Sequence, residues 1–68
     1  MNYYKRVTIM VQGEEITAPM LLLNSISLWA LEASNHYNSI GAQSLGIEAK
    51  ESSEQIYDQL EEMGLYKE

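Results

Sequence analysis

The stretch from Pro19 to Ile40 constrains the fold of this 68-residue chain more than any other part. Its apolar side chains recur at spacings of three, four and seven, which is the period of an α-helix and not of a strand. We therefore predict a helix over about residues 18–39, with Thr17 as its N-cap and Pro19 in its first turn. The stripe expected to face the core comprises Leu22, Ile26, Trp29, Ala33 and Ile40.

The same stretch carries apolar residues that do not belong to this stripe. At about 100° per residue, Leu21 and Leu28 lie to one side of it and Leu31 lies nearly opposite. A helix that is apolar most of the way round is usually covered on more than one side. Because so short a chain buries only about 60% of its unfolded surface, we expect self-association through this helix. The predicted partner-binding residues of this helix are Leu28, Trp29, Leu31 and Tyr37.

Residues 3–18 alternate between apolar and polar side chains, which predicts a β-hairpin. Val7, Ile9 and Val11 share one side of the first strand, and Ile16 continues the pattern in the second. The turn is expected at Gln12-Gly13, where glycine supplies the positive φ that a tight turn needs. Two strands are marginal alone, so these apolar residues should pack on the helix.

The apolar pattern resumes after Gly41 and predicts a second helix over about residues 42–63. A shorter helix that begins near residue 53 is the alternative, because Ser52 and Gln55 form a possible capping box. Gly64 should end the helix and Leu65 should pack behind it, with residues 66–68 as a loose end. The row expected to face inward comprises Ala42, Leu45, Ala49, Ile56, Leu60 and Met63.

The predicted fold is a single α+β domain over residues 1–68, in which an N-terminal hairpin packs on two antiparallel helices in the order ββαα. The chain has no Cys and one His, so we expect no disulfide, no metal site and no cofactor. The absence of Cys is typical of a reducing cytoplasm. No signal peptide and no membrane-spanning stretch is recognisable.

A catalytic role would have to use His36, with Glu32 one turn before it. Neither a nucleophile motif nor a set of oxyanion donors accompanies this pair, and a histidine near a helix end is commonly structural. We therefore predict that the protein is not an enzyme.

The net charge is −6, and the second helix carries a row of acids. Such a row is usually the solvated side of an amphipathic helix, but it can also bind a basic partner. We include it among the candidate partner-binding residues. The row comprises Glu51, Glu54, Asp58 and Glu61.

These observations predict a small binding protein that modulates or inhibits another protein, in the manner of accessory proteins of phages and mobile elements. A structural or assembly subunit that works by oligomerising is the alternative. A basic strand before two helices also resembles the ribbon-helix-helix repressors, which would make Lys5, Arg6 and Thr8 the residues that read DNA. The extra Gln12-Gly13 hairpin, the long first helix and the negative charge depart from that family, so nucleic acid is not the expected partner.

Overall fold

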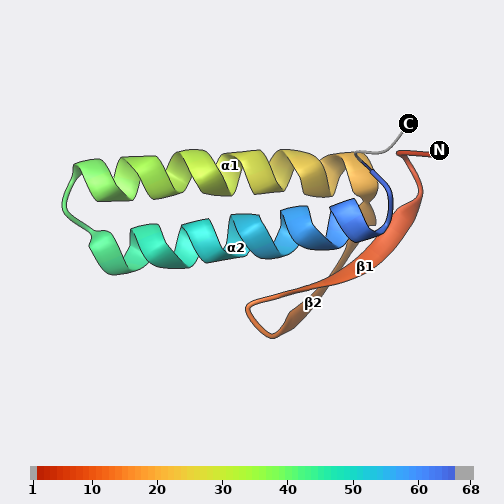
Figure 1. The fold of residues 1–68 in the computed structure, drawn as a ribbon, viewed down its shortest axis with the longest axis horizontal. Helices are drawn as coiled ribbons and strands as arrows, with labels where there is room; N and C mark the ends of the chain where they lie inside the picture. Colours follow the sequence, from red (N-terminus) through yellow and green to blue (C-terminus); the bar gives the residue numbers. More distant parts are fainter. Residues whose placement is uncertain (1, 66–68) are drawn as a thin grey trace.

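The computed structural model describes residues 2–65, and the expected loose end at residues 66–68 lies outside them. The described residues form two strands and two helices in the predicted order, so the ββαα α+β fold is confirmed (Figure 1). The elements are β1 (Arg6–Val11), β2 (Glu14–Pro19), α1 (Met20–Ser39) and α2 (Gln43–Glu62).

The two strands form an antiparallel hairpin in which Thr8 stands opposite Thr17. Their hydroxyl oxygens are 2.8 Å apart and share a hydrogen bond. The turn has φ of 50° at Gln12 and 80° at Gly13. Two successive positive φ angles are the signature of a type I′ turn, whose twist matches that of the strands.

The outer edge of β1 is bonded to side chains of α2 at the end nearest the turn. The Met10 N–H donates to Oε1 of Gln59 at 2.9 Å, and Nε2 of Gln59 donates to the Met10 carbonyl at 2.7 Å. The Gln12 N–H donates to Oε1 of Gln55 at 2.8 Å. The two glutamines take the places that a third strand would occupy, and we call Gln55 and Gln59 the glutamine clamp.

The start of α1 differs from the prediction. Pro19 is the N-cap, without a side-chain hydrogen bond, and Thr17 lies within β2 with its hydroxyl bonded to Thr8. The first two N–H groups of the helix instead bond to the segment that precedes β1. Met20 donates to the Lys5 carbonyl at 3.1 Å, and Leu21 donates to the Tyr3 carbonyl at 3.0 Å. Backbone carbonyls therefore do what a capping side chain does elsewhere.

Both helices end as the glycines predict. Gly64 has a φ of 91°, its N–H donates to the Glu61 carbonyl, and the Leu65 N–H donates to the Leu60 carbonyl. This is a Schellman motif, and Leu65 is buried in the core as such a motif favours. Gly41 ends α1 in the same way, with a φ of 82°. α2 runs unbroken from Gln43 through Ser52 and Gln55.

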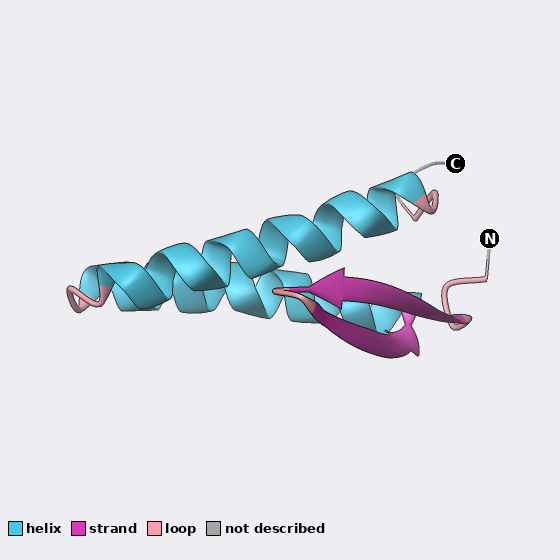
Figure 2. Cartoon of the chain, turned by 90° about the horizontal axis from the view of Figure 1, so that it is seen from below, coloured by secondary structure: helices cyan, strands magenta, loops and turns pink. Residues whose placement is uncertain are grey.

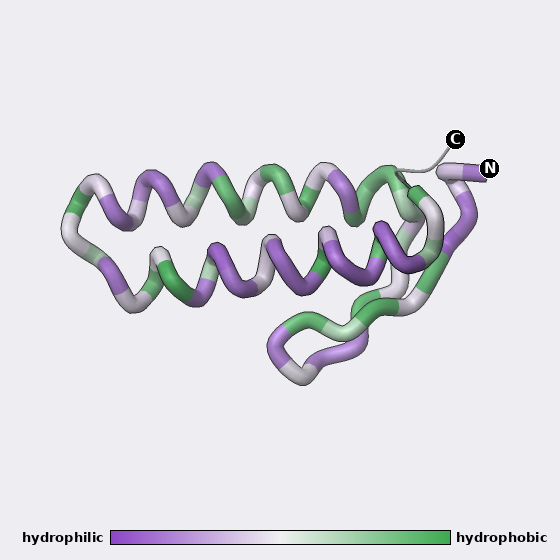
Figure 3. The backbone as a smooth tube through the Cα atoms, in the orientation of Figure 1, coloured by the Kyte–Doolittle hydropathy of each residue, from purple (hydrophilic) through white to green (hydrophobic). Residues whose placement is uncertain are grey.

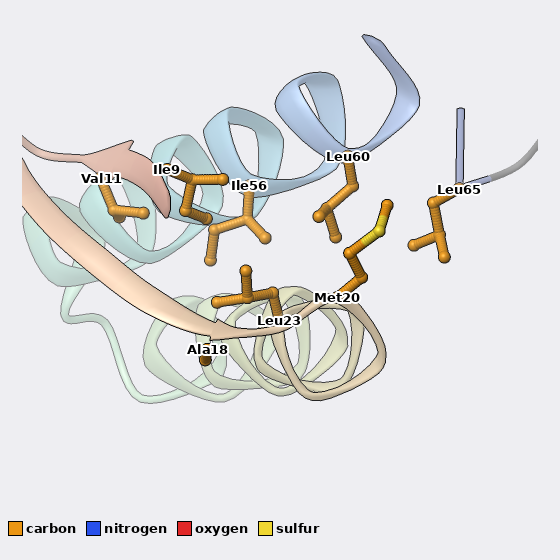
Figure 4. Close-up of a cluster of buried hydrophobic side chains, with 8 residues drawn as sticks. All are labelled: Ile9, Val11, Ala18, Met20, Leu23, Ile56, Leu60 and Leu65. Carbon is orange, nitrogen blue, oxygen red and sulfur yellow. The ribbon is translucent and has the colours of Figure 1, made fainter. Parts of the chain in front are cut away.

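The hydrophobic core lies at one end of the molecule, where the hairpin meets the start of α1 and the end of α2 (Figure 4). β1 packs mainly on α2, and β2 packs on α1. Val7, Ile16 and Ile26 are partly buried around the core, so the hairpin packs through the predicted apolar residues. The core comprises Ile9, Val11, Ala18, Met20, Leu23, Ile56, Leu60 and Leu65.

Away from the core, small residues hold the two helices together. The Ser53 hydroxyl donates to the Ser27 carbonyl at 2.8 Å, and the two hydroxyl oxygens are 3.2 Å apart. The Ser34 hydroxyl donates to the Gly46 carbonyl at 2.7 Å. All four residues are buried, and their size allows the helix backbones to approach closely. We call Ser27, Ser34, Gly46 and Ser53 the small-residue seam.

The seam means that the predicted inward rows are partly wrong. α1 faces α2 with Met20, Leu23, Ser27 and Ser34, whereas Leu22, Trp29 and Ile40 of the predicted stripe are exposed. In α2 the prediction holds for Ile56 and Leu60, but Leu45 and Met63 are exposed. Apolar periodicity locates the apolar side chains, and here the closest helix contact uses serine and glycine.

The molecule is elongated. Its Cα atoms span 40 × 24 × 16 Å with a radius of gyration of 12.6 Å, against about 11 Å for a compact chain of this length. Figure 2 shows the strands against one end of the helix pair, while the end with the α1–α2 turn extends beyond them. We call this extension, residues 28–50, the helical arm.

Candidate functional site

The helix pair has two broad faces that the chain covers very differently. The hairpin lies on one of them, the hairpin face, and stops near the middle of α2 (Figures 1 and 2). No described strand or helix lies over the opposite, open face. Figure 3 shows that the hydrophobic residues of α1 are concentrated in the half of the helix nearest the hairpin, and that the half leading to the α1–α2 turn is mostly hydrophilic. Exposed apolar residues lie on both faces.

On the hairpin face, a groove continues from the hairpin turn along the helical arm. It encloses about 370 Å³. The side chain of Gln12 reaches α2 at its inner end, where Nε2 donates to the Ser52 hydroxyl at 3.3 Å and to the Glu48 carbonyl at 3.5 Å. The groove is lined by Ala30, Ala33, Tyr37, Leu45, Glu48, Ala49 and Ser52. Three alanines make its floor shallow and apolar, which suits the side chains of another polypeptide.

Large apolar side chains stand along the α1 side of this groove. Trp29 is 60% exposed and Ile40 is 63% exposed. At about 100° per residue they lie on the same side of α1 as Ala33. Both residues belong to the stripe predicted to face the core, so that part of the prediction is wrong, whereas Ile26 of the same stripe is partly buried against the core.

The open face carries apolar residues from both helices. Leu28 is 56% exposed and Leu31 is 43% exposed; Leu21, Ile47 and Tyr57 are exposed to a similar degree. At the core end of this face Tyr3, Leu21, Asn24 and Leu65 surround a small pocket.

The four predicted binding residues of α1 are therefore on different faces. Tyr37 is half-buried in the groove and Trp29 lies beside it, whereas Leu28 and Leu31 belong to the open face. The sequence pattern did not place Ile47 among the predicted binding residues, and it predicted that Leu45 is buried. An apolar residue outside the expected inward row, such as Ile47, is the signal that points to a second apolar face.

All four predicted acids of α2 are exposed. Glu51 and Asp58 lie on the outer side of the helix, directed away from α1, and Glu54 and Glu61 lie toward the open face. The last turn of α2 contains no basic residue. The row is a continuous acidic surface and has no buried carboxylate.

The candidate catalytic pair lies on the surface of α1. Glu32 and His36 are both exposed, and the His36 ring lies 6.1 Å from the Tyr37 ring, centroid to centroid, in a tilted arrangement. Within residues 2–65 no cluster of three or more metal-ligating side chains is present. Neither of the two described helices is apolar enough over a sufficient length to span a bilayer.

Two of the three candidate DNA-reading residues are engaged within the hairpin. Arg6 Nη2 donates to the Thr17 carbonyl at 3.3 Å, and the Thr8 hydroxyl bonds to that of Thr17. The strand that would pair with a second copy is paired with β2 on one edge and held by the glutamine clamp on the other. These contacts oppose the ribbon-helix-helix alternative, in which that strand pairs between subunits.

Comparison with known proteins adds no assignment: no family model matches the sequence, and neither a curated protein nor a solved structure shows significant similarity to it.

Proposed function

We propose that this protein is a non-enzymatic binding module of the cytoplasm, which modulates or inhibits a partner protein through the groove of its helical arm. The observation that carries the proposal is the row of apolar side chains beside the groove, which the hairpin leaves uncovered. Trp29, which is 60% exposed, is the residue of this row from which we expect the largest contribution to binding. Aromatic residues of this kind supply much of the binding energy at protein interfaces.

The groove also indicates what its ligand is like. Its floor of alanines accepts the apolar side of a helix or an extended segment. Glu48 lines one wall, and the hairpin turn that contacts α2 at Ser52 leads directly into Glu14-Glu15. A segment with apolar residues on one side and basic residues at one end matches both features.

Affinity capture from the native host with the purified protein as bait tests this proposal. We expect a specific protein to be retained by the wild type and by Leu28→Gln, which alters the open face. The same protein should be lost with Trp29→Ala and with Leu45→Gln, each by tenfold or more in affinity, which corresponds to about 1.4 kcal/mol. Circular dichroism checks that each variant is folded. A partner that all four proteins retain equally, or none retained by the wild type, contradicts the proposal.

The alternative of a structural subunit makes a different prediction for the same protein. Such a subunit would form assemblies that grow with concentration, because its contacts do not close on themselves. Light scattering distinguishes these assemblies from a closed species of fixed mass.

A further inference from the structure

We propose that the open face binds a second copy of this chain, giving a closed dimer whose four helices form an antiparallel bundle. This face is separate from the groove, so the proposal does not depend on the proposed function.

The seam fixes which residues of the two helices lie at the same level. Ser27 is bonded to Ser53 and Ser34 to Gly46, so seven residues forward along α1 correspond to seven residues back along α2. Leu28 is therefore level with Ser52. A twofold axis that crosses both helices at this level would place α1 against α1 and α2 against α2, each pair antiparallel.

The open-face residues of α2 are self-complementary about this level. Each open-face residue that precedes Ser52 in one copy would lie opposite the residue that follows Ser52 by the same number of positions in the second copy. Lys50 would meet Glu54 of the second copy, and Glu54 would meet its Lys50, which gives two symmetric ion pairs. Ile47 would meet Tyr57 in the same way, and Gln43 would meet Glu61. A basic, an apolar and a polar position each find a suitable partner in a single register.

The open-face residues of α1 follow the same axis. Leu28 lies on it and would pack against Leu28 of the second copy, while Leu31 would lie near Asn24 and Leu21 near Asn35. An exposed leucine at the centre with amides toward the ends matches the usual plan of an interface, in which an apolar centre is surrounded by a polar rim.

The distribution of charge favours this antiparallel arrangement over a parallel one. The acids of α2 lie in residues 48–62, whereas residues 43–47 contain none. The antiparallel register places the acidic end of one α2 beside the neutral beginning of the other. A parallel register would place the two acidic ends together and Lys50 against Lys50, which is repulsive.

The available area is sufficient for a stable contact. A 20-residue helix is ~30 Å long and ~10 Å wide, so two of them present roughly 600 Å² in projection. Side chains that project from this face give it an accessible area larger than its projection, and stable interfaces bury about 800 Å² of accessible area per partner. Antiparallel bundles of four helices are a common way to cover such a face, and the hairpin does not obstruct it because it lies on the other side (Figure 2).

Light scattering coupled to size exclusion, with sedimentation equilibrium at micromolar protein, measures the outcome. We expect the wild type to have twice the chain mass of 7.7 kDa. Leu28→Lys places two like charges at the axis and should give a monomer. Leu22→Lys is the matched control, since Leu22 is 44% exposed on the other side of α1, and it should remain dimeric. Circular dichroism and thermal unfolding confirm that each variant is folded.

A charge exchange tests the register. Lys50→Glu alone and Glu54→Lys alone each create two like-charge pairs, so each should weaken dimerisation by about tenfold or more. When the two variants are mixed, every pair is again opposite in sign, and a heterodimer should form in preference to either homodimer. Native mass spectrometry separates these species. Charge pairs within one chain cannot produce this rescue, because neither variant chain contains an opposite pair.

A monomeric wild type overturns the proposal. The proposal is also overturned if the Leu28→Lys variant remains dimeric and the Leu22→Lys variant is monomeric, because the dimer interface would then be the hairpin face. Mixed Lys50 and Glu54 variants that show no preference for the heterodimer exclude this register.

Discussion

Gly46 is the residue at which the closeness of the helix pair can be tested most directly. A Cβ at this position would overlap the side-chain amide of Asn38 and would lie 3.3 Å from the Ser34 carbonyl. Asn38 is exposed and can rotate away, but the Ser34 carbonyl belongs to the backbone of α1. A residue larger than alanine must therefore push the helices apart and weaken the 2.7 Å bond from the Ser34 hydroxyl to the Gly46 carbonyl.

We predict that Gly46→Val lowers the free energy of unfolding by about 2 kcal/mol, which is typical of overpacking. Urea unfolding followed by circular dichroism measures this change. Ser44→Val is the matched control, because Ser44 is exposed in the same turn of α2 and the substitution changes only helix propensity. If Gly46→Val costs no more than Ser44→Val, the helices are not held by close approach at this point.

Among the elements, β1 depends on α2 for more than apolar contact. In an antiparallel pair, alternate residues direct their N–H and C=O groups away from the partner strand. Met10 is such a residue, Gln12 follows in the turn, and the glutamine clamp accepts both N–H groups. The clamp thus joins the hairpin to the helix pair by directional bonds.

We predict that Gln59→Leu speeds hydrogen exchange at the Met10 amide and lowers stability by about 1–2 kcal/mol, the range expected for two lost hydrogen bonds at an exposed site. The Ile9 amide, which faces β2 in the ladder, serves as the internal control and should lose protection only through the global change. NMR-detected exchange resolves the two. Equal acceleration at Met10 and Ile9 would show that the clamp has no local effect.

The positions of these elements could be read from the sequence, and their contacts could not. Alternation at Val7, Ile9 and Val11, the turn at Gly13 and the stop at Gly64 are local signals, so the hairpin and both helices were predicted in the right order. The pairing of α1 with α2 is not local. It uses Ser27 and Ser53, residue types that are usually exposed, and for that reason the stripe through Trp29 was wrongly assigned to the core.

The candidate site was predictable to the same limited extent. Exposure of Leu28 and Leu31 followed from their position away from the stripe. Their separation from Trp29 and Tyr37 depends on the direction in which α2 lies, which helical periodicity does not contain. The groove likewise depends on where the hairpin stops, and this is set by tertiary packing.

At the scale of the whole molecule, buried apolar residues are unevenly divided between the core and the helical arm. All eight core residues lie at the hairpin end, and the only buried residues of the arm are Ser34 and Gly46 of the small-residue seam. Local opening is easiest where few apolar contacts must be broken. The arm should therefore open without unfolding the core.

We predict that backbone amides near Asn35 and Glu48 exchange at least about tenfold faster than those of Leu23 and Ile56, a difference of ~1.4 kcal/mol in opening free energy. The measurement uses the Leu28→Lys variant, so that a second copy does not protect the arm. Uniform protection along both helices would show instead that the molecule unfolds as a single cooperative unit.

The closure of β1 by side-chain amides also bears on how the protein behaves when concentrated. A two-stranded sheet normally offers two edges for templated growth into cross-β polymers. Here Gln55 and Gln59 occupy the β1 edge near the turn, at Met10 and Gln12. Along the other, Pro19 has no N–H to offer, and Glu14 and Glu15 would repel an identical strand. Crowded solutions of this chain should consequently associate helix to helix and resist fibril formation.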